Sequence, residues 1–339
     1  MDRILTFSML IFFILIDFYR NGYGVDEPSY YKTYIEFRQN AGSFPFDFSF
    51  YAIYYLLDFI GVPSDYFNKT ITFIYLLILY GAVSKVTKEN FRSLHFLLLS
   101  FSYVSLDFMF NAYRQGFSFL FLYIAINEYL NGRLVKGSLW AAISAGFHWS
   151  SIIVVLLYFC SKLIREKQSY YLILLLFPFV LISMFTPLGV LKYAEMLINI
   201  LPVGDGFISH LNAYLDASNV ADSSMYSLNI FGRFPLAISV VGSLLFILLC
   251  YDRFNDKRII PLMALLLIYC LLFMEMAYSF RNYYWMLPFL ALIMVNYCSV
   301  TNGRDRTKRI ATILFIHLII SIPTFYTSGI NAMIYNIET

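Results

Sequence analysis

Charged residues are scarce in this chain of 339 residues. Aspartate, glutamate, lysine and arginine together make up 13% of it, whereas a soluble domain carries about 25%. Hydrophobic residues make up 60% and aromatic residues 20%. This composition leaves too little polar surface for an ordinary soluble domain. It predicts an all-α integral membrane protein that is surrounded by membrane lipid.

Cysteine is rare as well, and the motifs of many familiar enzymes are missing. The four cysteines, at positions 160, 250, 270 and 298, show no CxxC spacing, which argues against a disulfide framework and a metal site. No HExxH, DxD, Walker or Gly-x-Ser-x-Gly motif is present. The basic residues are dispersed among short loops, so no nucleic-acid partner is expected. We expect no cofactor and no metal.

Apolar runs close to the roughly 20 residues that a spanning helix needs recur along the chain. They predict about nine spanning helices in a single membrane domain, 1–339. The expected spans are 3–19, 66–83, 93–110, 114–130, 169–186, 230–250, 259–279, 283–300 and 310–327. The first run lacks a small-residue cleavage site, so we interpret it as a retained helix and not as a signal peptide.

The run from Ser93 to Leu130 contains no proline and is too long for one span. As one straight helix its 38 residues would measure about 57 Å, against a hydrocarbon core of about 30 Å. It must therefore fold into two helices. The polar segment from Asn111 to Gly116 is the expected hinge, on the outer side of the membrane.

Residues 138–160 form a further hydrophobic segment, which we expect to be a re-entrant or broken helix pair. His148 lies in its middle, among small and hydroxylated residues, and basic residues flank it at both ends. A simple span should be basic on one side only. The chain is therefore expected to enter the membrane, turn near His148 and return. Polar turns of this kind usually line a cavity.

The basic residues predict the orientation. Fifteen of the 24 lie in alternate loops: Lys85, Lys88, Arg92, Arg133, Lys136, Lys162, Arg165, Lys167, Arg253, Lys257, Arg258, Arg304, Arg306, Lys308 and Arg309. All of them share one side only if 138–160 returns to its starting face. The positive-inside rule then predicts a multi-pass protein with its N-terminus inside and its C-terminus outside.

Two long outer loops are expected, at 20–65 and 187–229. In the first loop, Asp26 or Glu27 can cap a helix that has Pro28 in its first turn. An aromatic helix over Phe48–Phe59 should follow, at the membrane interface. The second loop should contain a helix over Lys192–Leu201 and a turn at Pro202–Gly206.

Three arginines stand at outer helix ends, where the positive-inside rule does not explain them: Arg114, Arg233 and Arg281. Arginine stays charged and presents a planar donor fork that suits phosphate. Three such groups around one mouth would suit a diphosphate. The structural alternatives are snorkelling to lipid headgroups and pairing with Asp107.

Three further side chains are candidates for acid–base chemistry. Asp26 and Glu27 could act as a general base or orient a sugar hydroxyl, although helix capping explains them equally well. His148 can accept a proton near neutral pH or donate to a phosphate oxygen. Its structural alternative is a buried histidine bonded to a neighbouring helix.

Tyrosines are abundant on the expected outer segments, with Tyr113 and Tyr283 among them. A tyrosine ring can stack on a sugar ring, and its hydroxyl can bond to it. The alternative is the ordinary aromatic belt at the membrane interface.

Four short motifs resemble the EpsG-like family, whose members are usually assigned as Wzy-type polysaccharide repeat-unit polymerases. The motifs are Asp-Glu-Pro-x-Tyr-Tyr at 26–31, Ala-Tyr-Arg-Gln-Gly at 112–116, Phe-His-Trp-Ser-Ser at 147–151 and Arg-Asn-Tyr-Tyr at 281–284. By this resemblance, Arg114, Gln115, His148 and Arg281 fall on recurrent polar positions of the family. The loop at 187–229 matches no motif.

The resemblance implies a glycosyltransferase of the bacterial cytoplasmic (inner) membrane. Such an enzyme joins undecaprenyl-diphosphate-linked oligosaccharide units into exopolysaccharide, capsule or O-antigen on the outer face. A flippase and a chain-length regulator of the same pathway would be its partners. In this hypothesis the arginines, Arg233 included, hold the donor diphosphate, and His148 or Asp26 deprotonates the acceptor.

Three other functions stay open on the sequence. A GT-C-type glycosyltransferase that uses a polyprenyl-monophosphate sugar has a similar layout, with acids in the first outer loop, and a GT-C-like arrangement fits the expected spans. A lipid-linked glycan flippase should show two related halves, and no internal repeat is evident. A membrane O-acyltransferase would also use a membrane histidine.

Overall fold

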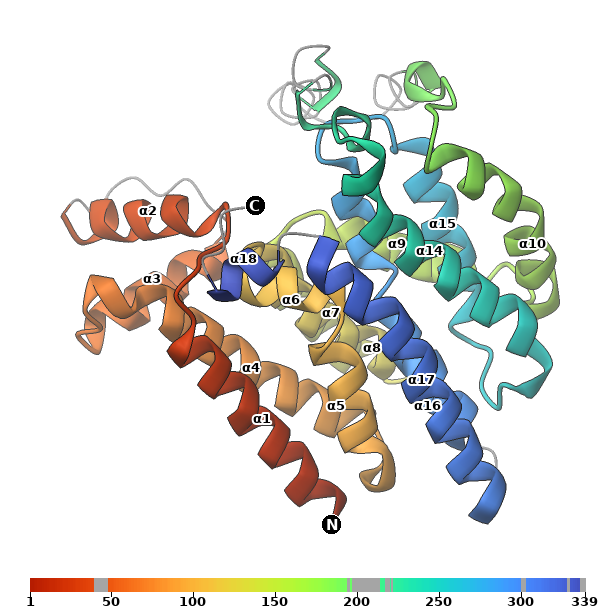
Figure 1. The fold of residues 1–339 in the computed structure, drawn as a ribbon, viewed down its shortest axis with the longest axis horizontal. Coiled ribbons are helices and arrows are strands. Elements are labelled where there is room, and N and C mark those ends of the chain that lie inside the picture. Colours follow the sequence, from red (N-terminus) through yellow and green to blue (C-terminus); the bar gives the residue numbers. More distant parts are fainter. Residues whose placement is uncertain are drawn as a thin grey trace. The chain divides into compact units, whose positions relative to one another are not determined.

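The computed structural model is built from α-helices and short 3₁₀ turns, with no strand in the part of the chain that it describes (Figure 1). It describes all residues except 40–47, 194–195, 197–213, 217–219, 221, 300–302, 328–329 and 336–339. The predicted all-α class is confirmed. The helices form two compact units, Met1–Leu156 with Gly329–Thr339, and Leu157–Ser328.

The first unit contains the helices up to the break at His148, together with the C-terminal helix. These are α1 (Asp2–Tyr19), α2 (Glu27–Gln39), α3 (Phe48–Phe59), α4 (Phe67–Val86), α5 (Arg92–Ser100), α6 (Tyr103–Phe110), α7 (Tyr113–Leu130), α8 (Leu134–Phe147) and α18 (Ile330–Tyr335). The predicted bounds of α3 are confirmed. In α2, Tyr30, Tyr34 and Phe37 are all buried and share one face of the helix.

The predicted hinge after residue 110 is present, but a second break precedes it. Helix α6 ends at Phe110 and α7 begins at Tyr113. The unbroken span predicted over 93–110 is wrong, because the chain bends by 72° between α5 and α6. A new helix, α6, starts after the bend because the Ser102 hydroxyl accepts a hydrogen bond from the backbone N–H of Ser105 at 3.3 Å and caps the helix.

Helices α7 and α8 pack as an antiparallel pair. Ser118 near the start of α7 hydrogen-bonds Ser144 near the end of α8, and Tyr129 near the end of α7 bonds Ser138 near the start of α8. After α8 the helix is broken as predicted. It ends at Phe147, and α9 (Ser151–Ser161) begins after a three-residue gap.

The boundary between the units falls inside α9, and the second unit contains the described helices that follow it as far as Ser328. They are α10 (Glu166–Ser183), α14 (Ile230–Cys250), α15 (Ile260–Leu272), α16 (Phe289–Ser299) and α17 (Gly303–Thr327), with 3₁₀ turns at Met225–Ser227, Tyr251–Arg253 and Ser279–Trp285. The predicted bounds 230–250 are confirmed for α14. The predicted helix at Lys192–Leu201 and the turn after it lie largely outside the described residues.

Two predicted spans of this unit are shorter than the apolar pattern indicates. Helix α15 stops at Leu272 instead of continuing to 279, and α16 starts at Phe289 instead of 283. Between them the chain bonds to the long loop: Ala277 N–H donates to Tyr214 O and Tyr278 N–H to Ser223 O. Those bonds take the place of helical ones, and Tyr278 has a positive φ of 55°.

Three helical segments of the described chain are long and apolar enough to cross a membrane: Ser64–Val86, Ile230–Arg253 and Gly303–Tyr326. The bent pair α5–α6 makes up to four. Helices α8, α9 and α15 are apolar but shorter. At about 1.5 Å per residue, α15 is only about 20 Å long. The count of nine spans therefore stays a prediction.

Each unit has one end where basic residues gather. In the first unit Lys85 at the end of α4 lies 3.5 Å from Glu128 near the end of α7, and Arg3 pairs with Glu89. In the second unit Arg309 of α17 donates to Tyr297 O at the end of α16 at 2.8 Å. Loop residues Lys257 and Arg258 lie beside Glu166 at the start of α10.

Candidate functional site

The opposite end of the first unit holds a buried ion cluster centred on Arg20. This residue follows α1 directly and is 7% exposed. Its guanidinium donates to Asp17 Oδ1 at 2.8 Å, to both carboxylate oxygens of Glu27, with Nη1 2.8 Å from Oε2, and to Gly22 O at 3.2 Å. Burial, the largest single effect, lowers the pKa of Arg20, but the hydrogen bonds to Glu27 together with the nearby charges of Glu27, Tyr113 and Asp17 outweigh it, and the pKa is raised. The guanidinium is therefore a permanent cation.

Glu27 is fully buried and joins three segments of the chain. Its carboxylate accepts from Arg20 after α1, from the Gly24 N–H at 2.7 Å and from the Tyr113 hydroxyl at the start of α7. A buried carboxylate needs such compensation, because desolvation of an uncompensated charge costs several kcal/mol. These contacts fix the first turn of α2 to the end of α1 and to the start of α7.

Asp26, the acid next to Glu27 in the chain, has different surroundings. It is half-buried, and its backbone N–H donates to Asn111 Oδ1 at 2.7 Å. The Asn111 amide in turn donates to Asp107 Oδ1 at 3.0 Å. Gly24 permits this close approach, since a Cβ at that position would overlap the carbonyl oxygen of Phe110. The loop 20–26 is thus docked on the turn between α6 and α7.

Arg114 and Gln115 belong to the first turn of α7, directly after Tyr113. Arg114 is half-buried and Gln115 is buried. Burial raises the pKa of Tyr54, and the positive charge of Arg114 partly offsets that effect, which shows that Arg114 lies near Tyr54 of α3. Asp107, considered above as a partner for the arginines, contacts Asn111.

His148 lies at the same end of the α7–α8 pair as Arg114. Its Nδ1 hydrogen-bonds Ser150 Oγ at 2.9 Å, and its backbone carbonyl accepts from Ser118 Oγ at 3.4 Å. Ser118 is four residues after Arg114, so both point from one face of α7. The geometry therefore brings the imidazole segment and the guanidinium to one face of one helix.

An aromatic layer supports this end of the unit. The rings of Phe117 and Phe147 stack at 5.3 Å between centroids, which holds the end of α8 against α7. Tyr30 contacts Tyr113 at 5.2 Å and Phe50 at 5.4 Å. Helices α2, α3, α7 and α8 are thereby packed into one framework around the polar residues.

The other predicted residues belong to the second unit. Arg233 donates to three carbonyl oxygens, of Leu228, Phe185 and Tyr226, each at 2.9 Å. These bonds join the start of α14 to the segment just after α10, and a part of Arg233 in substrate binding stays a prediction. Arg281 is half-buried beside Tyr278, and Tyr283 is fully buried. Their part in substrate binding stays a prediction.

Sequence reasoning missed Arg20 and Asn111. Arg20 follows the first span on the expected outer side, where the positive-inside rule does not explain an arginine, so the argument that selected Arg114 also applies to it. Asn111 was identified only as part of a hinge. Nothing in its local sequence indicates that its amide holds the backbone of Asp26, which is 85 residues away.

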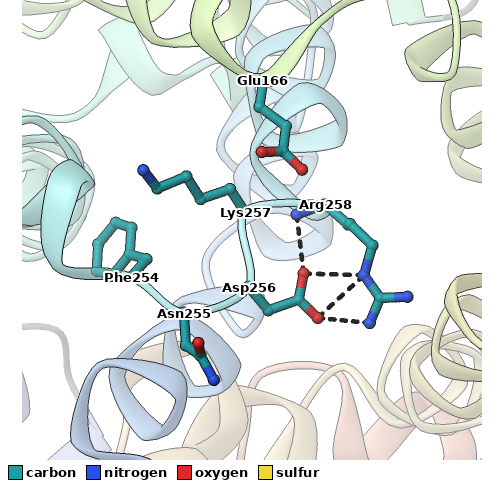
Figure 2. Close-up of a pocket in the computed structure, with 6 residues that line it drawn as sticks. All are labelled: Glu166, Phe254, Asn255, Asp256, Lys257 and Arg258. Atoms are coloured by element: carbon teal, nitrogen blue, oxygen red, sulfur yellow. Dashed lines mark hydrogen bonds and ion pairs between the residues drawn. The ribbon is translucent and has the colours of Figure 1, made fainter. Parts of the chain in front are cut away.

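A cavity of about 560 Å³ lies at the basic end of the second unit. It is lined by Glu166, Phe254, Asn255, Asp256, Lys257 and Arg258 (Figure 2). Figure 2 shows Asp256 and Arg258 turned toward each other, with Nη2 2.6 Å from Oδ2. This pair lowers the pKa of Asp256. The two acidic and two basic side chains of the lining carry no net charge together. None of the lining residues is a predicted site residue.

The described residues contain no group of three or more His, Cys, Asp or Glu side chains that could hold a metal ion. Among comparisons with known proteins, the model of the EpsG family matches residues 3–337. No curated protein and no solved structure matches the chain.

Proposed function

Because the chain belongs to the EpsG family, we propose that it is a glycosyltransferase that polymerises lipid-linked oligosaccharide repeat units. The family itself is associated with a polysaccharide-related, polymerase-like function. The donor would be an undecaprenyl-diphosphate-linked unit at the outer face of the bacterial cytoplasmic membrane. The product would be exopolysaccharide, capsule or O-antigen.

The contacts within the first unit support opposite sides for the two termini. The Asn21 N–H, just after α1, donates to Ile334 O in α18 at 3.0 Å. Figure 1 shows α18 beside the end of α1 that is remote from the N-terminus. If α1 crosses the membrane, the start of the chain and α18 lie on opposite faces. An odd number of crossings follows, in agreement with the nine predicted spans.

The charge distribution supports a re-entrant path through His148. Helix α8 begins beside the basic end of the first unit, where Arg133 pairs with Glu128, and ends beside Ser118. Helix α9 leads to Lys162, which lies near Asp256 at the basic end of the second unit. Basic ends face the cytoplasm by the positive-inside rule. From this rule we expect the chain to move outward in α8 and back in α9.

The proposed chemistry is a substitution at the anomeric carbon of the donor sugar. A hydroxyl of the acceptor unit attacks that carbon and forms the new C–O bond. The bond from the anomeric carbon to the diphosphate oxygen breaks, and its electron pair leaves with the diphosphate. The acceptor proton passes to the Asp26 carboxylate or the His148 imidazole. Arg114 stabilises the charge that grows on the departing diphosphate.

The observation that carries this proposal is the gathering of Asp26, Arg114 and His148 at one end of the first unit. An acid, a permanent cation and an imidazole are the groups that such a transfer needs. Glu27 adjoins Asp26 in the chain, and Tyr113 and Gln115 flank Arg114; Glu27 and Tyr113 act here as anchors. Arg281, Arg233 and Tyr283 are not needed for the argument.

The test is gel analysis of the surface polysaccharide in a deletion strain complemented with variants. The deletion should leave a single capped repeat unit, and wild type should restore the ladder. His148→Ala and Arg114→Ala should restore no ladder at unchanged protein level. Arg38→Ala is the matched control, because Arg38 is an outer arginine of α2 that pairs with Asp58. A repeat unit that lacks one sugar would favour the GT-C alternative, and lipid-linked units trapped inside would favour a flippase.

A further inference from the structure

The end of the loop 20–26 and the first residue of α2 are hydrogen-bonded at two points to the α6–α7 turn and the start of α7. The Tyr113 hydroxyl donates to Glu27 Oε1, and the Asp26 N–H donates to Asn111 Oδ1 at 2.7 Å. Tyr113 is the residue before Arg114, and Glu27 is the residue after Asp26. Each hydrogen bond therefore connects the immediate neighbourhood of the acid to that of the arginine.

The hydrogen bond between Tyr113 and Glu27 is held rigidly, because both side chains are buried and the charge of Glu27 is paired. Glu27 and Tyr113 have no exposed surface, and Arg20 closes the cluster with a bidentate contact to Glu27. The aromatic ring of Phe110 lies 4.9 Å from the Arg20 guanidinium and covers it. A bidentate arginine–carboxylate pair fixes orientation as well as distance.

We propose that Arg20, Glu27, Tyr113 and Asn111 are positioning residues that hold Asp26 at a set place relative to Arg114. This rests on the proposed function. It assigns different roles to the adjacent acids: Asp26 accepts the acceptor proton, and Glu27 acts only through its neighbours. His148 is then left to contact the substrate as a hydrogen-bond donor.

Tyr113→Phe is the sharpest variant, because it keeps the ring that packs on Tyr30 and removes only the hydroxyl. Tyr123→Phe is the matched control: Tyr123 is equally buried on the same helix, and its hydroxyl bonds His95 Nε2 at 2.6 Å, away from Asp26. Initial rates of polymerisation are measured in liposomes, with lipid-linked repeat units extracted from the deletion strain as substrate.

Tyr113→Phe should lower kcat by about 10- to 100-fold, because a misplaced group can cost about that much. KM should stay within about two-fold, since the lost interaction acts in the transition state. The control should keep its kcat within about two-fold while its thermal midpoint falls. Arg20→Lys, which keeps the charge, should recover part of the rate that Arg20→Gln loses.

A wild-type kcat in Tyr113→Phe, or an equal loss in Tyr123→Phe, would overturn the positioning role. Asn111→Leu removes the acceptor of the second hydrogen bond, and we expect the same split between kcat and KM. If neither Tyr113→Phe nor Asn111→Leu folds, the two hydrogen bonds are needed for folding itself and the proposal is wrong. A wild-type protein that makes no polymer would instead refute the proposed function.

Discussion

Ser118 in α7 and Ser144 in α8 hydrogen-bond each other through their hydroxyls at 2.9 Å. Each hydroxyl also lies within hydrogen-bonding distance of the backbone carbonyl of the other residue, at 2.8 and 2.7 Å. Small residues of this kind let two membrane helices approach closely and supply polar contacts between them. The pair sets the separation of α7, which carries Arg114, from α8, which ends directly before His148.

Widening this contact should therefore disturb both stability and activity. Ser144→Leu places a large side chain where there is no space, and overpacking costs about 1–3 kcal/mol. Ser118→Ala loses hydrogen bonds alone and should cost about 1 kcal/mol. Thermal unfolding in detergent should rank the leucine variant below the alanine variant. Equal midpoints would argue against a close helix contact.

Gly24 should tolerate no side chain. A Cβ there would overlap Phe110 O, and the loop would have to leave the α6–α7 turn. Gly24→Ala should reduce polymer length and lower the thermal midpoint. Gly81→Ala is the control, because Gly81 lies in α4 with open space at its Cβ. Alanine favours a helix over glycine by up to about 1 kcal/mol, so the control should be neutral or more stable.

Removing Arg20 should destabilise the protein far more than removing an exposed arginine. Arg20→Ala leaves Asp17 and Glu27 buried without their cation, and loss of one partner of a buried pair costs about 3–5 kcal/mol. Arg3→Ala breaks a pair whose side chains are 67% and 60% exposed, which is worth about 0–1 kcal/mol. Chemical denaturation in detergent compares them. Similar losses would contradict the burial of the Arg20 cluster.

The Asp256–Arg258 pair should contribute stability that depends on pH. The hydrogen bond from Arg258 lowers the pKa of Asp256 below its ordinary 3.8. The contribution is thus fully present above pH about 4 and is lost as pH falls through the lowered pKa. The pair is partly exposed, so the effect is below about 1 kcal/mol. The difference in unfolding midpoint between wild type and Asp256→Asn should shrink as pH falls below 4, and a constant difference would contradict the pairing.

Cysteine labelling should show that the two ends of the first unit face opposite sides of the membrane. In a variant whose four native cysteines are replaced, Tyr23→Cys should react with a membrane-impermeant maleimide in intact cells, because Tyr23 is exposed and lies in the loop that is predicted to be outer. Lys88→Cys, an exposed position at the basic end, should react only after permeabilisation. Labelling of both positions in intact cells would refute the orientation.

Much of the fold could be predicted because it depends on local pattern. The bounds of α3 and α14 and the break at His148 all follow from apolar periodicity, turn residues and charge. The bend between α5 and α6 could not, because the hydroxyl of Ser102 competes with a continuous helix within an otherwise apolar run. The shortened α15 could not either, because bonds from the distant segments at Tyr214 and Ser223 replace its last turn.

The sequence by itself determined that this is a helical membrane protein of the EpsG family, with Asp26, Arg114 and His148 as candidate site residues. Composition and short motifs are local properties and can be read without a structure. Only the tertiary structure decided that Glu27 is enclosed by Arg20, Tyr113 and Gly24, whereas Asp26 is held through its backbone by Asn111. The two acids are adjacent and chemically similar. Their difference arises from contacts with residues up to 86 positions away, and burial makes those contacts decisive.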